Sequence, residues 1–345
     1  MLSKISWAEF RLHLLFIVCL TASCDSRHAE SNQQIIAFGT RVELNIYGGD
    51  AERIAAVTSL IEARYREIDR DWYPWDRATV SSPGELQRIN TALASGQSAD
   101  VSPPLASLIR RAAAIEKRSL GRFNPGIGRL TQLWGFDNVL RENWAPPAAA
   151  AVQAIVDAAP GSSHLQWNEN TLTSHSTVTQ IDLGGIAKGA ILGLTAELLR
   201  DAGLDYAIIN IGGDLTVLGN VHGRPARIGI RSPVADEPIG WLDVADGETV
   251  VTSGDYERFF LHEGKKYAHI LDPKSGYPVQ HTSSVTVIHR DPILADAAAT
   301  ALVVAGMAEF DQTCAALGIR QAILIDSSGE LRLTADMGGR VNWVR

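Results

Sequence analysis

The amino-acid sequence predicts an α+β fold, and two observations support that class. Segments with helical periodicity and segments with the alternation of a β-strand follow each other in mixed order. A regular strand–helix–strand repeat, which would indicate a parallel α/β sheet, is not visible. The chain has 345 residues, 46% of them hydrophobic, which is enough to bury the core of one large or two modest domains.

The first half of the chain is predicted to contain one strand and three helices. The strand ends at a glycine turn, and the first helix carries its apolar residues on one face. Two prolines open the third helix, because proline is tolerated in a first turn. In chain order we expect the strand at 38–47, the helix at 51–69, a loop at 72–90, the helix at 104–119 and the helix at 146–159.

The second half is predicted to be richer in short strands, with glycine turns between them. Its helices are expected to be rich in alanine and leucine, which favour the helical state. In chain order we expect a hairpin at 165–178, a helix within 182–202, strands at 207–211, 227–231, 240–244, 249–252, 256–262 and 285–289, a helix around Asp296, a helix at 308–317 and two closing strands.

The N-terminus is predicted to be a targeting segment outside the fold. Lys4 and Arg11 flank an apolar stretch at 12–20 that is too short for a confident membrane span. Small residues then precede Cys24, as they do in a bacterial lipobox. We therefore expect a lipoprotein signal peptide at 1–23 and a lipid on Cys24, with plain secretion as the alternative.

The mature chain would consist of a polar tether at 24–34 and one folded unit at 35–345. Asp25 resembles a retention signal of bacterial lipoproteins, so the expected location is the periplasmic face of the inner membrane. With Cys24 lipidated, only Cys314 remains, so no intramolecular disulfide is possible. The formal net charge of -8 argues against a general nucleic-acid surface.

Asp296 and Thr300 are the most informative pair of residues. They stand four residues apart in an alanine-rich run at 295–306 that is predicted to be helical. At that spacing both side chains project from one face of the helix. A carboxylate and a hydroxyl on an apolar face need partners, because burying them bare is costly. Two oxygen ligands offered to a hard cation would meet that need.

Glycine-rich junctions are the next candidates for a binding site. The segment 182–189 follows a strand and opens a helix, so its backbone amides either approach a phosphate or form a tight turn capped by Asp182. Lys188 would then either pair with the phosphate or lie on a solvated face. Asp214 follows the double glycine at 212–213 and would hold a ligand hydroxyl or stabilise that turn.

His269 and two aromatic residues complete the candidates. His269 stands three residues before Asp272, which would bring imidazole and carboxylate together and favour an oriented base. The alternative is a turn in which the histidine only packs on its neighbours. Trp134 and Phe136 follow a glycine loop at 123–128 and would either stack on a flat ring system or belong to the core.

The order of these motifs is similar to that of the FAD:protein FMN transferase family, also called ApbE. The resemblance extends over about residues 36–340. The motifs that carry it are Phe38-Gly-Thr, Glu85-Leu-x-Arg88-x-Asn90, Phe123-Asn-Pro-x-x-Gly128, Leu133-Trp-Gly-Phe136, Asp182-Leu-Gly-Gly-Ile-Ala-Lys-Gly189, Asn210-x-Gly-Gly-Asp214, Thr252-Ser-Gly-Asp-Tyr256, His269-x-x-Asp-Pro-x-x-Gly-x-Pro278 and Ala295-Asp-Ala-x-Ala-Thr300-Ala-Leu.

The resemblance implies a Mg²⁺-dependent enzyme that transfers FMN from FAD to a threonine or serine hydroxyl of a partner, such as a respiratory flavoprotein subunit, and releases AMP. It also implies one ApbE-like, T-fold-like catalytic unit with an FAD cleft between two lobes. By matching positions, Mg²⁺ would be held by Asp296, Thr300 and the backbone of Gly185. The matching FAD contacts are Phe38, Trp75, Arg122, Phe123, Asn124, Asp182, Lys188 and Leu271.

The accepting hydroxyl needs help in losing its proton, and either His269 or Asp255 would serve as that base. The chain departs from the family pattern at a few positions. Asn124 replaces a common aspartate, Phe38 replaces a methionine, and Trp75 stands where tyrosine is common. Two other functions fit the same motifs: a Mg²⁺-dependent FAD pyrophosphatase that yields FMN and AMP, and a lipoprotein that binds FAD without turnover.

Overall fold

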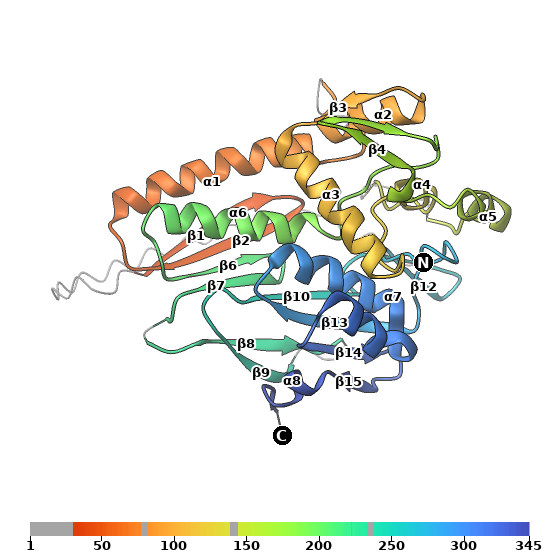
Figure 1. The fold of residues 1–345 in the computed structure, drawn as a ribbon. Helices are drawn as coiled ribbons and strands as arrows, with labels where there is room; N and C mark the ends of the chain where they lie inside the picture. The colour runs from red at the N-terminus through yellow and green to blue at the C-terminus, as the bar shows by residue number, and fades with distance from the viewer. Residues whose placement is uncertain (1–29, 77–81, 139–143, 222, 234–236, 345) are drawn as a thin grey trace, which may run out of the picture.

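The centre of the structure is an eight-stranded antiparallel sheet in the order β1-β2-β6-β7-β10-β13-β14-β15 (Figure 1). The computed structural model describes residues 30–76, 82–138, 144–221, 223–233 and 237–344. The strands of the sheet are β1 (Glu30–Ala37), β2 (Thr40–Tyr47), β6 (Ala207–Ile211), β7 (Asp214–Leu218), β10 (Thr249–Gly254), β13 (Thr282–His289), β14 (Ala322–Asp326) and β15 (Leu331–Leu333).

Long helices cover one face of this sheet (Figure 1). These helices are α1 (Ala51–Asp71), α6 (Ala187–Asp201), α7 (Pro292–Leu317) and, on the outside, α3 (Pro103–Arg118). Helices α1 and α6 pack against the N-terminal part of the sheet, and helix α7 packs against its C-terminal part. Helix α3 lies against α7 on the side away from the sheet (Figure 1).

A small three-stranded sheet packs on the opposite face, where apolar side chains of both sheets form a separate core cluster. Its strands are β8 (Ala226–Arg231), β9 (Pro238–Val244) and β16 (Asn342–Trp343). The remaining elements are short. They are α2 (Glu85–Ala94), β3 (Ala99–Asp100), α4 (Gly128–Leu133), α5 (Ala149–Asp157), a 3-10 turn (Ser162–His164), β4 (Leu165–Asn168), β5 (Thr171–Ser174), β11 (Phe259–His262), β12 (Lys265–Ala268) and α8 (Ala335–Gly338).

Local sequence explains where the main elements begin and end. Asp50 caps α1 by accepting a hydrogen bond from the Arg53 amide at 2.8 Å. Two-residue turns join β1 to β2 and β6 to β7, and all four turn residues have positive φ, which is the backbone of a tight hairpin. Three of the four are glycines. The fourth, Phe38, adopts a conformation that is costly for a bulky residue.

The apolar C-terminal helix is a core helix. By length and composition α7 is apolar enough to cross a membrane, and it is the one such helix in the described part of the chain, but most of its apolar stretch is buried in the fold. Asp291 caps its start by accepting from the amides of residues 293 and 294. Gly306, at φ 60 and ψ −170, interrupts the helix. The two predicted helices at this place are therefore confirmed as two halves joined at Gly306.

Several predicted boundaries were wrong. The tether was expected to reach residue 34, but β1 begins at Glu30. The expected loop at 72–90 contains the start of α2, and the helix expected from Pro146 begins at Ala149. The signal peptide, Cys24 and the first part of the tether lie outside the described residues.

Helices α6 and α7 approach each other at Gly189. A Cβ atom built on Gly189 would lie 2.2 Å from the carbonyl oxygen of Pro292 and 2.9 Å from the Cβ of Asp296. Both neighbours belong to α7, and one of them is backbone that cannot rotate away. Only glycine therefore allows this contact, and the contact sets the position of Asp296.

We predict that Gly189→Ala lowers the free energy of unfolding by about 1–3 kcal/mol or more, because the added methyl group overpacks the helix contact. Thermal unfolding followed by circular dichroism measures the change. Gly338→Ala is the matched control, because a Cβ at Gly338 meets nothing within 4 Å. Equal melting temperatures for the two variants would show that α6 and α7 are not in close contact at Gly189.

Candidate active site

Asp296 lies in the buried interface between α6 and α7, with 2% of its surface exposed. Its Oδ2 accepts a hydrogen bond from the Gly189 amide at 2.8 Å. Burial is the largest influence on the carboxyl group and raises its pKa, as does nearby Asp214, whereas Lys188 and the amides at the start of α6 lower it. The fold thus holds a carboxylate in a place where its charge needs a positive partner.

The other two predicted metal ligands lie at the same junction. Thr300 follows Asp296 by one helical turn and is half-buried. Gly185 precedes α6, and a Cβ on it would lie 3.0 Å from the Thr300 Oγ1 and 3.3 Å from the ring of Phe123. The structure therefore brings Gly185, Thr300 and Phe123 together, with Asp296 on the adjoining turn.

The donor set at this junction fits Mg²⁺. The described residues contain no group of three or more His, Cys, Asp and Glu side chains that would hold a metal by themselves. The predicted site has a different composition: one carboxylate, one hydroxyl and one peptide carbonyl. All three are hard oxygen donors, and Mg²⁺ in nucleotide sites typically takes only one or two carboxylates and completes its shell with water and phosphate oxygens.

Lys188 is paired with a buried acid. Its ammonium group forms an ion pair with Asp214, which is 1% exposed and also accepts a hydrogen bond from the Thr252 amide at 3.0 Å. Burial opposes the charged form of Lys188, but Asp214 and Asp296 outweigh that effect and raise its pKa. Lys188 is therefore a fixed positive charge, and Asp214 anchors it at the start of β7.

Negative charge exceeds positive charge around Lys188. Asp214, Asp296 and Glu257 all act electrostatically on the lysine. Partial burial raises the pKa of Glu257, and Lys188 and Arg231 oppose that rise. Three carboxyl groups thus face two cations, Lys188 and Arg231, an arrangement that attracts a divalent cation. We did not predict Glu257, although its place directly after the Asp255-Tyr256 motif was a usable signal.

His269 is held in one tautomer by a backbone carbonyl. Its own amide donates to the Arg258 oxygen at 3.0 Å, and its Nδ1 lies 3.1 Å from the same oxygen. Because a carbonyl only accepts, Nδ1 carries the hydrogen and Nε2 keeps a free lone pair. Burial and the charge of Arg258 lower the pKa of His269 to about 4. The imidazole is therefore neutral at neutral pH, with Nε2 as its unprotonated nitrogen.

Asp272 does not orient His269, so of the two predicted alternatives the structure shows the second, a turn at Asp272 with His269 packed on a neighbour, Phe136. The Asp272 carboxylate accepts from the amides of Lys274 at 2.9 Å and Ser275 at 3.3 Å, so it closes its own turn. The Arg258 carbonyl takes the orienting role.

Asp255, the other candidate base, has a cationic partner. It is 8% exposed, and its Oδ2 lies 2.6 Å from the Lys266 ammonium. The geometry therefore favours His269 over Asp255 as a proton acceptor.

Arg122 and Asn124, two of the predicted flavin contacts, form hydrogen bonds within the protein. The guanidinium of buried Arg122 binds Glu309 on α7, with Nε at 2.8 Å from the carboxylate, and also donates to the Ser119 oxygen. Asn124 donates to the Pro160 oxygen at 2.8 Å and accepts from the Gly126 amide. An aspartate at position 124 could not donate a hydrogen bond to the Pro160 oxygen, which explains why asparagine stands there in this chain.

The remaining predicted flavin contacts lie on separate segments. Phe38 packs edge-on against Tyr65, with ring centroids 5.2 Å apart. Trp75 and Leu271 are buried. Asp182 accepts hydrogen bonds from the Thr131 hydroxyl at 3.0 Å and the Gly184 amide at 2.9 Å, so it shapes the turn that leads to Gly185. The aromatic pair Trp134 and Phe136 belongs to a core cluster.

Residues 38–324 match the family model of the ApbE family. The chain belongs to the ApbE family. This confirms the family predicted from the motif order, and with it the prediction of an enzyme.

Two relatives above 30% identity share one name. The chain is 35% identical over 317 residues to an FAD:protein FMN transferase of Rhodobacter capsulatus, covering 91% of this chain but 58% of that relative's length. It is 34% identical to an FAD:protein FMN transferase of Klebsiella pneumoniae, covering 84% of this chain and 85% of the relative.

Solved ApbE structures share the fold. The ApbE protein of Thermotoga maritima superposes with a TM-score of 0.81 at 26% identity, covering 90% of this chain and 99% of the other. The apo form of the Pseudomonas stutzeri flavinyl transferase ApbE gives a TM-score of 0.78 at 26% identity, covering 91% and 97%. The predicted mixed fold of helices and strands is confirmed.

The low pKa of His269 predicts a pH dependence of stability. The unfolded imidazole titrates near its ordinary pKa of 6.5 and the folded one near 4. The unfolded state therefore binds more protons between these values, and the free energy of unfolding falls as the pH falls through that window. Between pH 7 and pH 4.5 we therefore expect the free energy of unfolding to fall less in His269→Gln than in the wild type. Calorimetry at a series of pH values measures this difference. The exposed His175→Gln is the control, and parallel curves for all three proteins would contradict the assignment.

Proposed function

We propose that this chain is an FAD:protein FMN transferase that uses Mg²⁺ and attaches FMN to a threonine or serine hydroxyl of a partner flavoprotein. The names of its relatives support the reaction. The observation that carries the site assignment is the buried Asp296 carboxylate, held by the Gly189 amide beside Thr300 and Gly185. A protein that only bound FAD would not need a buried acid at such a junction.

The proposed reaction exchanges one phosphorus–oxygen bond for another. The hydroxyl oxygen of the acceptor bonds to the phosphorus of the FMN half, the bond to the bridging oxygen breaks, and AMP leaves with that oxygen. Held by Asp296, Thr300 and the Gly185 carbonyl, Mg²⁺ would neutralise charge on the diphosphate.

The chain's own residues would handle the proton and the remaining charge. His269 accepts the proton of the acceptor hydroxyl at Nε2, because its Nδ1 is fixed by the Arg258 carbonyl. Lys188 supplies a fixed positive charge, kept in place by Asp214. The predicted contacts Phe38, Trp75, Asp182 and Leu271 would bind FAD, with the flavin cleft between the two lobes as the sequence resemblance implies.

The location and the partner are also proposals. The lipobox-like sequence before Cys24 supports a lipid anchor at the periplasmic face of the inner membrane, and β1 begins six residues after that cysteine, at Glu30. An anchored enzyme would meet acceptors in or on the same membrane, such as a subunit of a respiratory flavoprotein.

We predict that Asp296→Asn reduces both AMP release and flavin attachment by at least about 100-fold, because the metal's charge stabilisation is worth several kcal/mol. Purified protein, FAD, Mg²⁺ and an acceptor domain are incubated, and the acceptor is weighed by mass spectrometry. Asp311→Asn, an exposed aspartate of the same helix, is the matched control. Full activity of Asp296→Asn would remove the metal assignment, and free FMN without a modified acceptor would indicate a pyrophosphatase.

A second prediction separates the two candidate bases. We expect His269→Gln to lower the transfer rate by about 10²–10⁴-fold, the usual contribution of a general base, while FAD binding is retained. Asp255→Asn should have a smaller effect, because Lys266 already neutralises that acid. Single-turnover kinetics with saturating FAD measure both rates. A larger loss in Asp255→Asn would reverse the assignment.

A further inference from the structure

Asn90 connects α2 to the extended segment that leads into the site. Its side-chain Nδ2 donates to the Ile181 oxygen at 2.8 Å, and its Oδ1 accepts from the Ile181 amide at 2.8 Å. Asn90 is 6% exposed, and 91 residues separate the two partners in sequence. One side-chain amide thus satisfies both polar groups of a single peptide residue, as a neighbouring strand would.

The connection completes the support of an extended segment at 180–182. On one side this segment pairs with the glycine loop: Gln180 donates to Gly126, Gly128 donates to Gln180 at 2.9 Å, and Asp182 donates to Pro125 at 2.8 Å. In extended backbone, successive residues turn their peptide groups to opposite sides. The groups of Ile181 therefore face away from the loop, and Asn90 binds them there.

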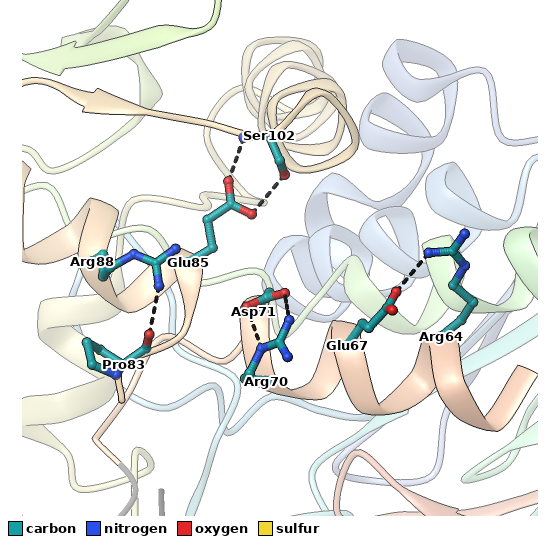
Figure 2. A network of polar contacts seen from close by, with 8 residues as sticks. All are labelled: Arg64, Glu67, Arg70, Asp71, Pro83, Glu85, Arg88 and Ser102. Carbon is teal, nitrogen blue, oxygen red and sulfur yellow. Dashed lines mark hydrogen bonds and ion pairs between the residues drawn. The ribbon is translucent and has the colours of Figure 1, made fainter. Parts of the chain in front are cut away.

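The helix that carries Asn90 is itself firmly attached (Figure 2). Glu85 accepts from the Ser102 amide at 2.5 Å and from the Ser102 hydroxyl at 2.8 Å, which ties α2 to the start of α3. Arg88 donates to the Pro83 oxygen at 2.9 Å. A Cβ on Gly84 would lie 1.9 Å from the Arg70 oxygen, so α2 begins directly against the end of α1. Asn90 therefore projects from a fixed position.

We propose that Asn90 is a positioning residue for the proposed reaction. By binding Ile181 it fixes the turn from Asp182 to Gly185, and through Gly185 it fixes the backbone oxygen offered to the cation beside Thr300. This inference rests on the proposed function. Groups that orient metal ligands through one further hydrogen bond typically change metal affinity 10–100-fold when they are removed.

The pattern of α2 shows why an amide is needed. Leu86, Ile89 and Leu93 are buried on the same face of the helix as Asn90. A leucine at position 90 would continue that apolar face and keep the shape of the contact, while leaving both polar groups of Ile181 without a partner. The other bonds of the 180–182 segment would remain, so the fold persists and the turn is free to shift.

The experiment compares Asn90→Leu and Asn90→Asp with wild type and with Glu85→Ala, in the full chain. Glu85→Ala is the matched control, because it removes a tie of the same helix to α3, while the contact at Gly84 and the two bonds from Asn90 to Ile181 still hold α2. Mn²⁺ alone is the probe, and its binding is measured by electron paramagnetic resonance, together with melting temperature and the FMN-transfer rate. We expect Asn90→Leu to weaken Mn²⁺ binding at least tenfold. Glu85→Ala should lower only the melting temperature.

Asn90→Asp adds a rescue that a merely structural role would not show. Its carboxylate still accepts from the Ile181 amide but faces the Ile181 oxygen without a hydrogen to donate. Protonation restores that donor, so its Mn²⁺ affinity relative to wild type should recover as the pH is lowered.

Each outcome has a defined meaning. Wild-type Mn²⁺ affinity in folded Asn90→Leu, or an equal loss in Glu85→Ala, would overturn the positioning role and leave the proposed function intact. An absence of Mn²⁺ binding in the wild type would overturn the cation site, and the positioning role with it.

Discussion

The site depends on one close contact between two helices. Gly189 lets the start of α6 touch the backbone of α7, and its amide binds the Asp296 carboxylate at 2.8 Å. That contact buries an acid that has no room to turn away. Burial raises the pKa of Asp296, and the cost of keeping it charged is met by positive charge nearby: Lys188 in the structure, and Mg²⁺ in our proposal. The fold therefore creates a need for positive charge, which the proposed cation would meet.

The antiparallel sheet brings the other groups to this contact from distant parts of the chain. Asp214 begins β7 and holds Lys188, which lies in the first turn of α6. His269 follows β12 and takes its orientation from a backbone carbonyl. Because each group is fixed by backbone or by a buried partner, little rearrangement is needed when a substrate binds. Such preorganisation is the main protein contribution to phosphoryl transfer.

Periodicity predicted the long elements, and the structure differs from the sequence prediction mainly where a partner lies far away in the chain. The helix around Asp296 followed from its alanine-rich composition, and the break at Gly306 lies between the two helices that the sequence predicted there. The short helix α2 was not predicted, because it directly follows a segment rich in glycine, proline and serine that indicated a loop. Its apolar residues nevertheless have helical spacing. The roles of Arg122 and Asn124 were not predictable, because Glu309 and Pro160 are distant in sequence.

The most direct test of the central claim is the position of the cation. A crystal structure of the chain grown with AMP and Mn²⁺, with the metal located by its anomalous scattering, would give that position. The account predicts one Mn²⁺ bound directly by oxygens of Asp296 and Thr300, with the Gly185 carbonyl in the same shell. A metal bound elsewhere, with the Asp296 carboxylate still bound to the Gly189 amide as in the present structure, would contradict it.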